Sequence, residues 1–130
     1  MQYLLDTNWA IDYLNRIERV VRRVEELETE GIGISIISLA ELYEGVFYSR
    51  DPEEDERELR IFLRGIEIVD VDDEICRIFA IDRGRLRGAG AIIGDFDIMI
   101  GATAKRHRLT LLTNNRRHFE RIQDLNIISV

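Results

Sequence analysis

The stretch "LLDTN", Leu4–Asn8, decides how the first part of the chain folds. Two leucines end a short apolar run that begins at Tyr3, and the carboxylate of Asp6 follows them directly. An apolar run that stops at a polar cluster predicts a buried strand over residues 3–5. An aspartate just after a strand is either the cap of the next helix or a ligand of a functional site. The residues further along the chain bear on which interpretation holds.

Apolar runs and helical periodicity alternate through the rest of the 130 residues. Apolar residues recur at helical spacing between Ile17 and Leu27, and Gly31 ends this helix. Pro52, directly after Asp51, is typical of the first turn of a helix. We expect strands at residues 3–5, 32–36, 66–71, 109–113 and 126–129, and helices at 8–14, 16–30, 38–48, 52–64, 73–86, 95–106 and 116–123.

Strands that alternate with helices predict βαβ units and therefore a parallel sheet. The predicted strands are nearly continuous apolar runs, as burial on both faces of a sheet requires. We therefore expect an α/β fold with three layers, α/β/α, around a central parallel sheet of about five strands. The length and the lack of any linker-like segment favour a single domain over residues 1–130.

Composition limits the cellular setting and the class of partner. The formal charge is −7, whereas a protein that binds nucleic acid by bulk electrostatics is basic. Lys105 is the only lysine, so 17 of the 18 cations are arginine, which matches phosphate oxygens bidentately. Cys76 is alone, which suits a reducing cytoplasm, and we expect it to be buried. No apolar stretch approaches the ~20 residues that span a bilayer, so no membrane partner is expected.

Acidic residues follow several of the predicted strands. Asp6 follows the first strand, and Glu41 lies in the opening turn of the helix after the second. Asp95 and Asp97 open the helix before the fourth strand. Each has a purely structural interpretation, because Asp6 and Asp95 suit helix N-caps and Glu41 completes a capping box that begins at Ser38. Together they would meet at the carboxyl edge of the sheet, where carboxylates repel one another unless a cation compensates them.

The candidate ligands are all oxygens, which favours Mg²⁺ or Mn²⁺ over zinc. His107 and His118 lie in arginine-rich segments, and we expect them to be solvated or to contact nucleic acid rather than to bind metal. Asp95 and Asp97 would diverge by about 200° on a helix. We therefore expect Asp97 to be the better ligand and Asp95 to be a cap, a second ligand or both.

Four segments together resemble the PIN-domain family, and specifically the VapC toxins of toxin–antitoxin pairs. They are "LLDTN", "SLAELYEG" (Ser38–Gly45), "IGDFDIMIGATA" (Ile93–Ala104) and "LTLLTNNRRHFERI" (Leu109–Ile122), in the family's order and spacing over essentially the whole chain. The resemblance implies a Mg²⁺- or Mn²⁺-dependent endoribonuclease that hydrolyses RNA phosphodiester bonds. It also implies a homodimer and a VapB-type antitoxin as the protein partner.

The resemblance assigns roles residue by residue. Asp6, Glu41 and Asp97 match the family's three acids, and Asp95 lies beside the third. Thr7 and Asn8 complete the first motif, and we expect them to cap the following helix and to orient Asp6.

The last motif departs from the family at one position. Asn115 stands two residues after Thr113, where the family often has a fourth acid. The amide removes a negative charge, so one tightly bound ion is a safer expectation than two. Asn115 can still bind through its carbonyl oxygen or orient a water molecule.

Three basic segments flank the acidic motifs and are candidates for contact with RNA: Arg83–Gly88, Lys105–Arg108 and Arg116–Arg117. The expected substrate is RNA with single-stranded or loop regions, such as tRNA or rRNA. Two alternatives stay open. One is a PIN-like fold that has lost catalysis and only binds. The other is a phosphorelay receiver, which the sole lysine disfavours because it lies in a predicted helix and not after the last strand.

Overall fold

The computed structural model describes residues 1–130 and contains one sheet of five parallel strands. The strand order is β3-β2-β1-β4-β5. The strands are β1 (Tyr3–Leu5), β2 (Ile32–Ser35), β3 (Glu67–Val69), β4 (Thr110–Leu112) and β5 (Ile127–Ile128). The predicted α/β class, the parallel sheet and the number of strands are confirmed.

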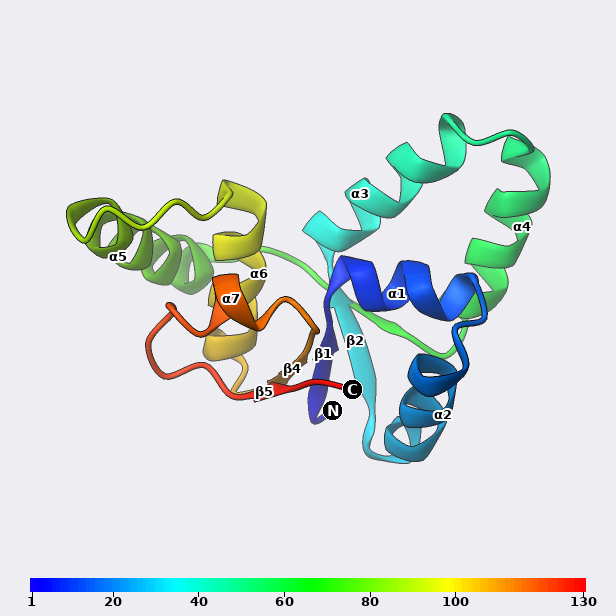
Figure 1. Cartoon of the computed structure of the whole chain (residues 1–130), viewed down its shortest axis with the longest axis horizontal. Coiled ribbons are helices and arrows are strands. Elements are labelled where there is room, and N and C mark those ends of the chain that lie inside the picture. Colours follow the sequence, from blue (N-terminus) through cyan, green and yellow to red (C-terminus); the bar gives the residue numbers. More distant parts are fainter.

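Helices cover both faces of the sheet, which gives the predicted three layers (Figure 1). One face is covered by α1 (Thr7–Leu14), α2 (Glu18–Leu27), α3 (Ile36–Phe47) and α4 (Pro52–Leu63). The other is covered by α5 (Asp73–Gly88), α6 (Asp95–Arg106) and α7 (Arg116–Phe119). None of these helices is long and apolar enough to cross a membrane.

Alternation of side chains along the central strands feeds two separate cores. Leu5 and Leu112 pack with α1 to α4, whereas their neighbours Leu4 and Leu111 pack with α5 to α7. Successive residues of a strand point to opposite faces, and all four leucines are fully buried. The uninterrupted apolar run in the sequence therefore reflects burial on both sides.

Several boundaries differ from the predicted ones. The helix expected at residues 16–30 is α2 followed by a 3₁₀ turn at Glu28–Glu30. The helix expected from residue 38 begins at Ile36, because Ser35 is its N-cap and accepts a hydrogen bond from the Ile37 amide at 3.0 Å. The third strand is shorter than predicted, with three residues, and it is an edge strand that pairs on one side only. The predicted helix at 116–123 is also shorter, because α7 spans four residues.

The order of the strands reverses at β1, and we call the carboxyl edge of the sheet at this point the crevice. The chain proceeds from β1 outward through β2 to β3, and then crosses to β4 and β5 on the other side of β1. Ligands of open α/β sheets bind at the carboxyl ends of strands where the order reverses in this way. Asp6 follows β1 and Thr113 follows β4, so the fold brings the first and last predicted motifs together at this point.

Candidate active site

Asp6 lies at the centre of the crevice and is only 3% exposed. It is the N-cap of α1, and its Oδ1 accepts a hydrogen bond from the Thr7 amide at 2.8 Å. Its Oδ2 accepts a hydrogen bond from the Thr113 hydroxyl at 2.7 Å. Both interpretations of Asp6 are therefore compatible, since the same carboxylate caps a helix and stands in the crevice.

The electrostatic environment of Asp6 disfavours its charge. Burial, together with the nearby charges of Asp97 and Glu41, raises the pKa of Asp6 from 3.8 to about 6, although the hydrogen bonds from Thr113 and Thr7 lower it. A buried carboxylate that faces two others is a costly arrangement for a fold to keep. A cation in the crevice would relieve the cost, which identifies this edge as the candidate active site.

Glu41 reaches the crevice from α3 and is held there by Thr7. The Thr7 hydroxyl donates to Glu41 Oε1 at 2.7 Å and lies 2.9 Å from the hydroxyl of buried Ser38. The predicted capping box is wrong, because α3 begins at Ile36 and places Glu41 in its second turn. Thr7 therefore orients Glu41 with its side chain and Asp6 only with its amide. The capping role expected of Thr7 and Asn8 belongs to Asp6, and Asn8 is exposed.

Asp97 enters the crevice from the first turn of α6. Its Oδ2 lies 3.3 Å from Nδ1 of His118, and the same nitrogen lies 3.0 Å from the side-chain nitrogen of Asn115. One ring nitrogen either donates or accepts, so a protonated Nδ1 serves Asp97 and an unprotonated one serves Asn115. The sequence predicted that His118 is solvated or contacts nucleic acid, and it did not predict this contact with Asp97. Its spacing of three residues from Asn115, at the start of a helix, was the available signal.

Asp95 turns away from the three central acids. Its carboxylate is exposed and pairs with Arg83 of α5 at 2.7 Å. The hydrogen bond from Arg83 lowers the pKa of Asp95, and the charges of Arg83 and Arg87 act in the same direction. The N-cap of α6 is Gly94, so the predicted cap at Asp95 is wrong. The divergence expected for residues 95 and 97 on one helix accounts for the opposite directions of the two side chains.

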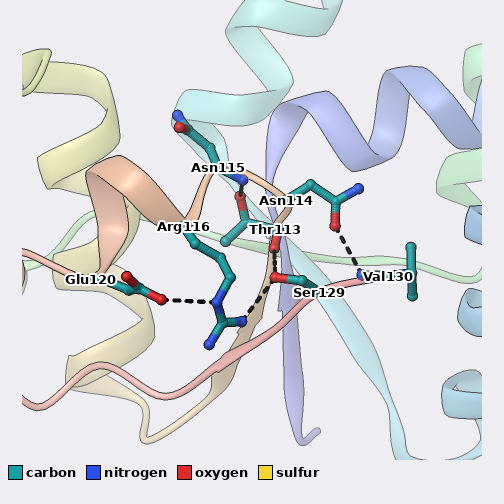
Figure 2. Close-up of polar contacts among 7 residues, drawn as sticks. All are labelled: Thr113, Asn114, Asn115, Arg116, Glu120, Ser129 and Val130. Atoms are coloured by element: carbon teal, nitrogen blue, oxygen red, sulfur yellow. Dashed lines mark hydrogen bonds and ion pairs between the residues drawn. The ribbon is translucent and has the colours of Figure 1, made fainter.

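The turn that carries Thr113 and Asn115 is fastened by the residues that follow β5 (Figure 2). Ser129 donates to the Thr113 carbonyl at 2.6 Å and accepts from Arg116 at 2.9 Å. The Thr113 hydroxyl also accepts from the Asn115 amide at 3.0 Å. The backbone of Asn115 is therefore fixed beside Thr113, the residue that donates to Asp6. No local pattern in the sequence indicated that Ser129 holds this turn.

The oxygens in the crevice suit a hard divalent cation. No three acidic, histidine or cysteine side chains lie close enough together to form a complete metal cage. Mg²⁺ does not need one, because it keeps several waters and binds through one or two carboxylates. Asp6, with its raised pKa and two neighbouring carboxylates, fits that mode of binding. Asn115 adds a neutral donor at the rim.

Known proteins agree with the fold and with the sequence motifs. The family model of the PIN domain matches residues 3–125. Ribonuclease VapC2 of Rickettsia felis is 36% identical over 127 residues, which are 96% of this chain and 95% of that protein. The tRNA(fMet)-specific endonuclease VapC of Salmonella typhimurium is 32% identical, over 98% of this chain and 96% of that protein.

Solved structures agree equally well. The crystal structure of VapBC2 from Rickettsia felis bound to a promoter DNA fragment has a TM-score of 0.94 at 34% identity, over 100% of this chain and 99% of that chain. DNA-bound VapBC from Salmonella typhimurium has a TM-score of 0.93 at 31% identity, over 99% and 98% of the two chains. On these matches in sequence and structure, the chain belongs to the PIN domain family.

Proposed function

We propose that the chain is a single PIN domain that acts as a metal-dependent endoribonuclease of the VapC toxin type. The observation that carries the proposal is Asp6, a buried carboxylate whose pKa is raised beside Asp97 and Glu41 at the point where the strand order reverses. Two relatives are a ribonuclease and a tRNA(fMet)-specific endonuclease, which supports RNA as the substrate. A tRNA or another RNA with an exposed loop fits best, because bases in loops are accessible.

The side chains of the crevice divide the work. Asp6 and Asp97 would hold Mg²⁺ or Mn²⁺, with Glu41 and Asn115 completing the polar rim. Bound there, the ion would lower the pKa of a water molecule and offset charge on the phosphoryl oxygens. Thr113 keeps Asp6 in place by its hydroxyl, and the Thr7 hydroxyl does the same for Glu41. No side chain has to form a covalent intermediate. Asp95, paired with Arg83, is not needed as a ligand.

The two alternatives are not favoured. The family match argues against a phosphorelay receiver, and Lys105 forms a partly buried ion pair with Asp82 at 2.8 Å instead of lying at the end of a strand. An inactive binding module is disfavoured because Asp6 is buried beside the like charges of Asp97 and Glu41, an arrangement that a bound cation would relieve.

Cleavage of single-stranded RNA tests the proposal. The wild type should cut in Mg²⁺ or Mn²⁺ and stop when EDTA is added, and Asp6→Asn should lose at least a thousandfold in rate. Equal cleavage by the wild type and by Asp6→Asn would show that the acids do not carry the reaction.

A VapB-type antitoxin is the proposed protein partner, since solved relatives are VapBC assemblies. A groove of about 680 Å³ lies between α2 and α4, with Phe62 and the half-exposed Ile61 on one wall and Glu54 and Glu58 on its rim. An apolar segment with basic flanks fits this surface. Ile61→Asp should abolish capture of the antitoxin while RNA cleavage persists, and retained capture would place the antitoxin elsewhere.

A homodimer is also proposed, and the mass of the protein in analytical ultracentrifugation tests it.

A further inference from the structure

Two of the three basic segments that flank the acids, Lys105–Arg108 and Arg83–Gly88, differ in their distance from the crevice and in their ion pairs. Lys105–Arg108 lies at the far end of α6, and ten residue steps of ~1.5 Å each carry Lys105 about 15 Å along the helix from Asp95. Lys105 forms an ion pair with Asp82, and Arg106 forms one with Asp72 at 3.4 Å. The two charges are therefore already paired, and they also lie far from the crevice. This segment therefore does not serve the crevice.

The segment Arg83–Gly88 ends α5 beside the first turn of α6. Arg85 is turned inward, toward the carbonyl of Arg121 at 3.3 Å and the buried Asp82 at 3.8 Å. Arg83 is the partner of Asp95. Arg87 is exposed and forms no ion pair, although α5 and α6 make the most extensive helix contact in the protein. The fold thus leaves Arg87 with a free guanidinium close to the opening of α6.

Arg83, Arg87 and Asp95 line one hollow of about 360 Å³. Its floor is apolar and includes buried Leu86 and Ile93. Gly94, also in the lining, is the N-cap of α6 and offers no side chain to its first amides, so the positive end of the helix faces this region. A hollow with an apolar floor and a cationic rim is suited to a nucleotide, whose base is apolar on its faces and whose phosphate is negative.

The hollow adjoins the crevice across a single helical turn. Asp95 lines the hollow, whereas Asp97 contacts His118 at the crevice, and both residues lie in the first turn of α6, a helix that is ~10–12 Å wide with its side chains. Phe96 lies between them and is 56% exposed, which offers an aromatic ring at the same turn. An RNA strand laid over this turn would reach both places at once.

We propose that this hollow binds a nucleotide that flanks the scissile phosphate, with Arg87 holding its phosphate and the apolar floor receiving its base. The inference rests on the proposed ribonuclease function. The acidic crevice and the net charge of −7 repel RNA, so the substrate needs a local site of attraction near the acids. A free cation one helical turn away supplies the local attraction that the protein as a whole lacks.

Arg87→Ala tests the proposal, with Arg19→Ala as the matched control. Arg19 is also exposed and without an ion pair, but it lies on α2, on the other side of the sheet (Figure 1). For cleavage of a short single-stranded RNA, we expect Arg87→Ala to raise KM about tenfold and to leave kcat within about twofold. The slope of the logarithm of the RNA-binding constant against the logarithm of the salt concentration should decrease by about the amount expected for one phosphate contact. Arg87→Lys should restore the salt dependence, and Arg19→Ala should change nothing.

Mn²⁺ affinity, followed by electron paramagnetic resonance, should be the same in Arg87→Ala and wild type. A KM and salt dependence equal to those of Arg19→Ala would overturn the proposal. So would a fall in kcat or in Mn²⁺ affinity, because Arg87 would then act on the acids and not on the substrate. If the wild type cleaves no RNA, the proposed function fails separately, and fluorescence anisotropy with the same RNA still decides whether Arg87 contributes to binding.

Discussion

Asp6→Asn should make the metal-free protein more stable at neutral pH while abolishing its activity. The pKa of Asp6 is raised from 3.8 to about 6. Each tenfold change in proton affinity corresponds to about 1.4 kcal/mol, so the ionised carboxylate costs the metal-free fold about 3 kcal/mol. Asparagine carries no charge, and its carbonyl can still accept one of the two hydrogen bonds that Thr7 and Thr113 donate. Losing the other costs about 1 kcal/mol, which leaves a net gain of about 2 kcal/mol.

The sign of the pH dependence follows from the raised pKa. Because the folded state binds the Asp6 proton more tightly than the unfolded state, the stability from this group is fully present below pH 3.8 and is lost as the pH rises through about 6. In EDTA, the free energy of unfolding of the wild type should therefore decrease relative to that of Asp6→Asn as the pH rises from 4 to 7.5. For a chain of this length, about 2 kcal/mol corresponds to roughly 6–10 °C in Tm.

Urea unfolding in EDTA at pH 4.5 and pH 7.5 measures the effect. Asp51→Asn is the matched control, because Asp51 also caps a helix but is exposed. Added Mg²⁺ should stabilise the wild type and leave Asp6→Asn nearly unchanged, as expected when only one of them binds the ion. An Asp6→Asn variant that is less stable than wild type at pH 7.5 in EDTA would refute the argument that like charges and burial disfavour this carboxylate.

The remaining predictions concern the groups that support the site. Thr7→Val should lower kcat about tenfold in RNA cleavage and alter the unfolding free energy by only about 1 kcal/mol, because it frees Glu41; Thr7→Ser should retain activity. Ser129→Ala should weaken Mn²⁺ binding severalfold by isothermal calorimetry, whereas Ser129→Thr should not. Lys105→Met should cost about 3 kcal/mol in urea unfolding, because it leaves the buried Asp82 with only the longer ion pair to Arg85 at 3.8 Å, and adding Asp82→Leu should recover part of the loss.

Local patterns in the sequence were sufficient for the architecture. Helical spacing and apolar runs depend on contacts between near neighbours, so the alternation of elements, the parallel sheet and α6 at residues 95–106 could be predicted. Boundaries failed where a neighbouring residue competed for the same role. Ser35 displaced Ser38 as the cap of α3, and Gly94 displaced Asp95 as the cap of α6. Cys76, expected to be buried, is exposed beside the buried Ile75.

The candidate site was predictable as a set of acids but not as an arrangement. The carboxyl edge of a parallel sheet brings together the residues that follow its strands and those that open the helices leading back to the next strand, so Asp6 and Asp97 could be grouped in advance. Their partners could not, because the Thr113 hydroxyl reaches Asp6 across 107 residues and His118 reaches Asp97 across 21. Such contacts depend on the strand order and on the rotation of each helix.

The sequence by itself determined that an acidic edge exists, because residue type and strand position are local properties. Only the tertiary structure decided which acid stands in the crevice and which arginines lie near it without an ion-pair partner. Asp95 and Asp97 differ by two residues, but rotation about α6 directs one toward Arg83 and the other toward Asp6. The aspartate of "LLDTN" is both a helix cap and the centre of the site. The pairing of β4 with β1 places Thr113 next to Asp6, where its hydroxyl donates a hydrogen bond to the carboxylate.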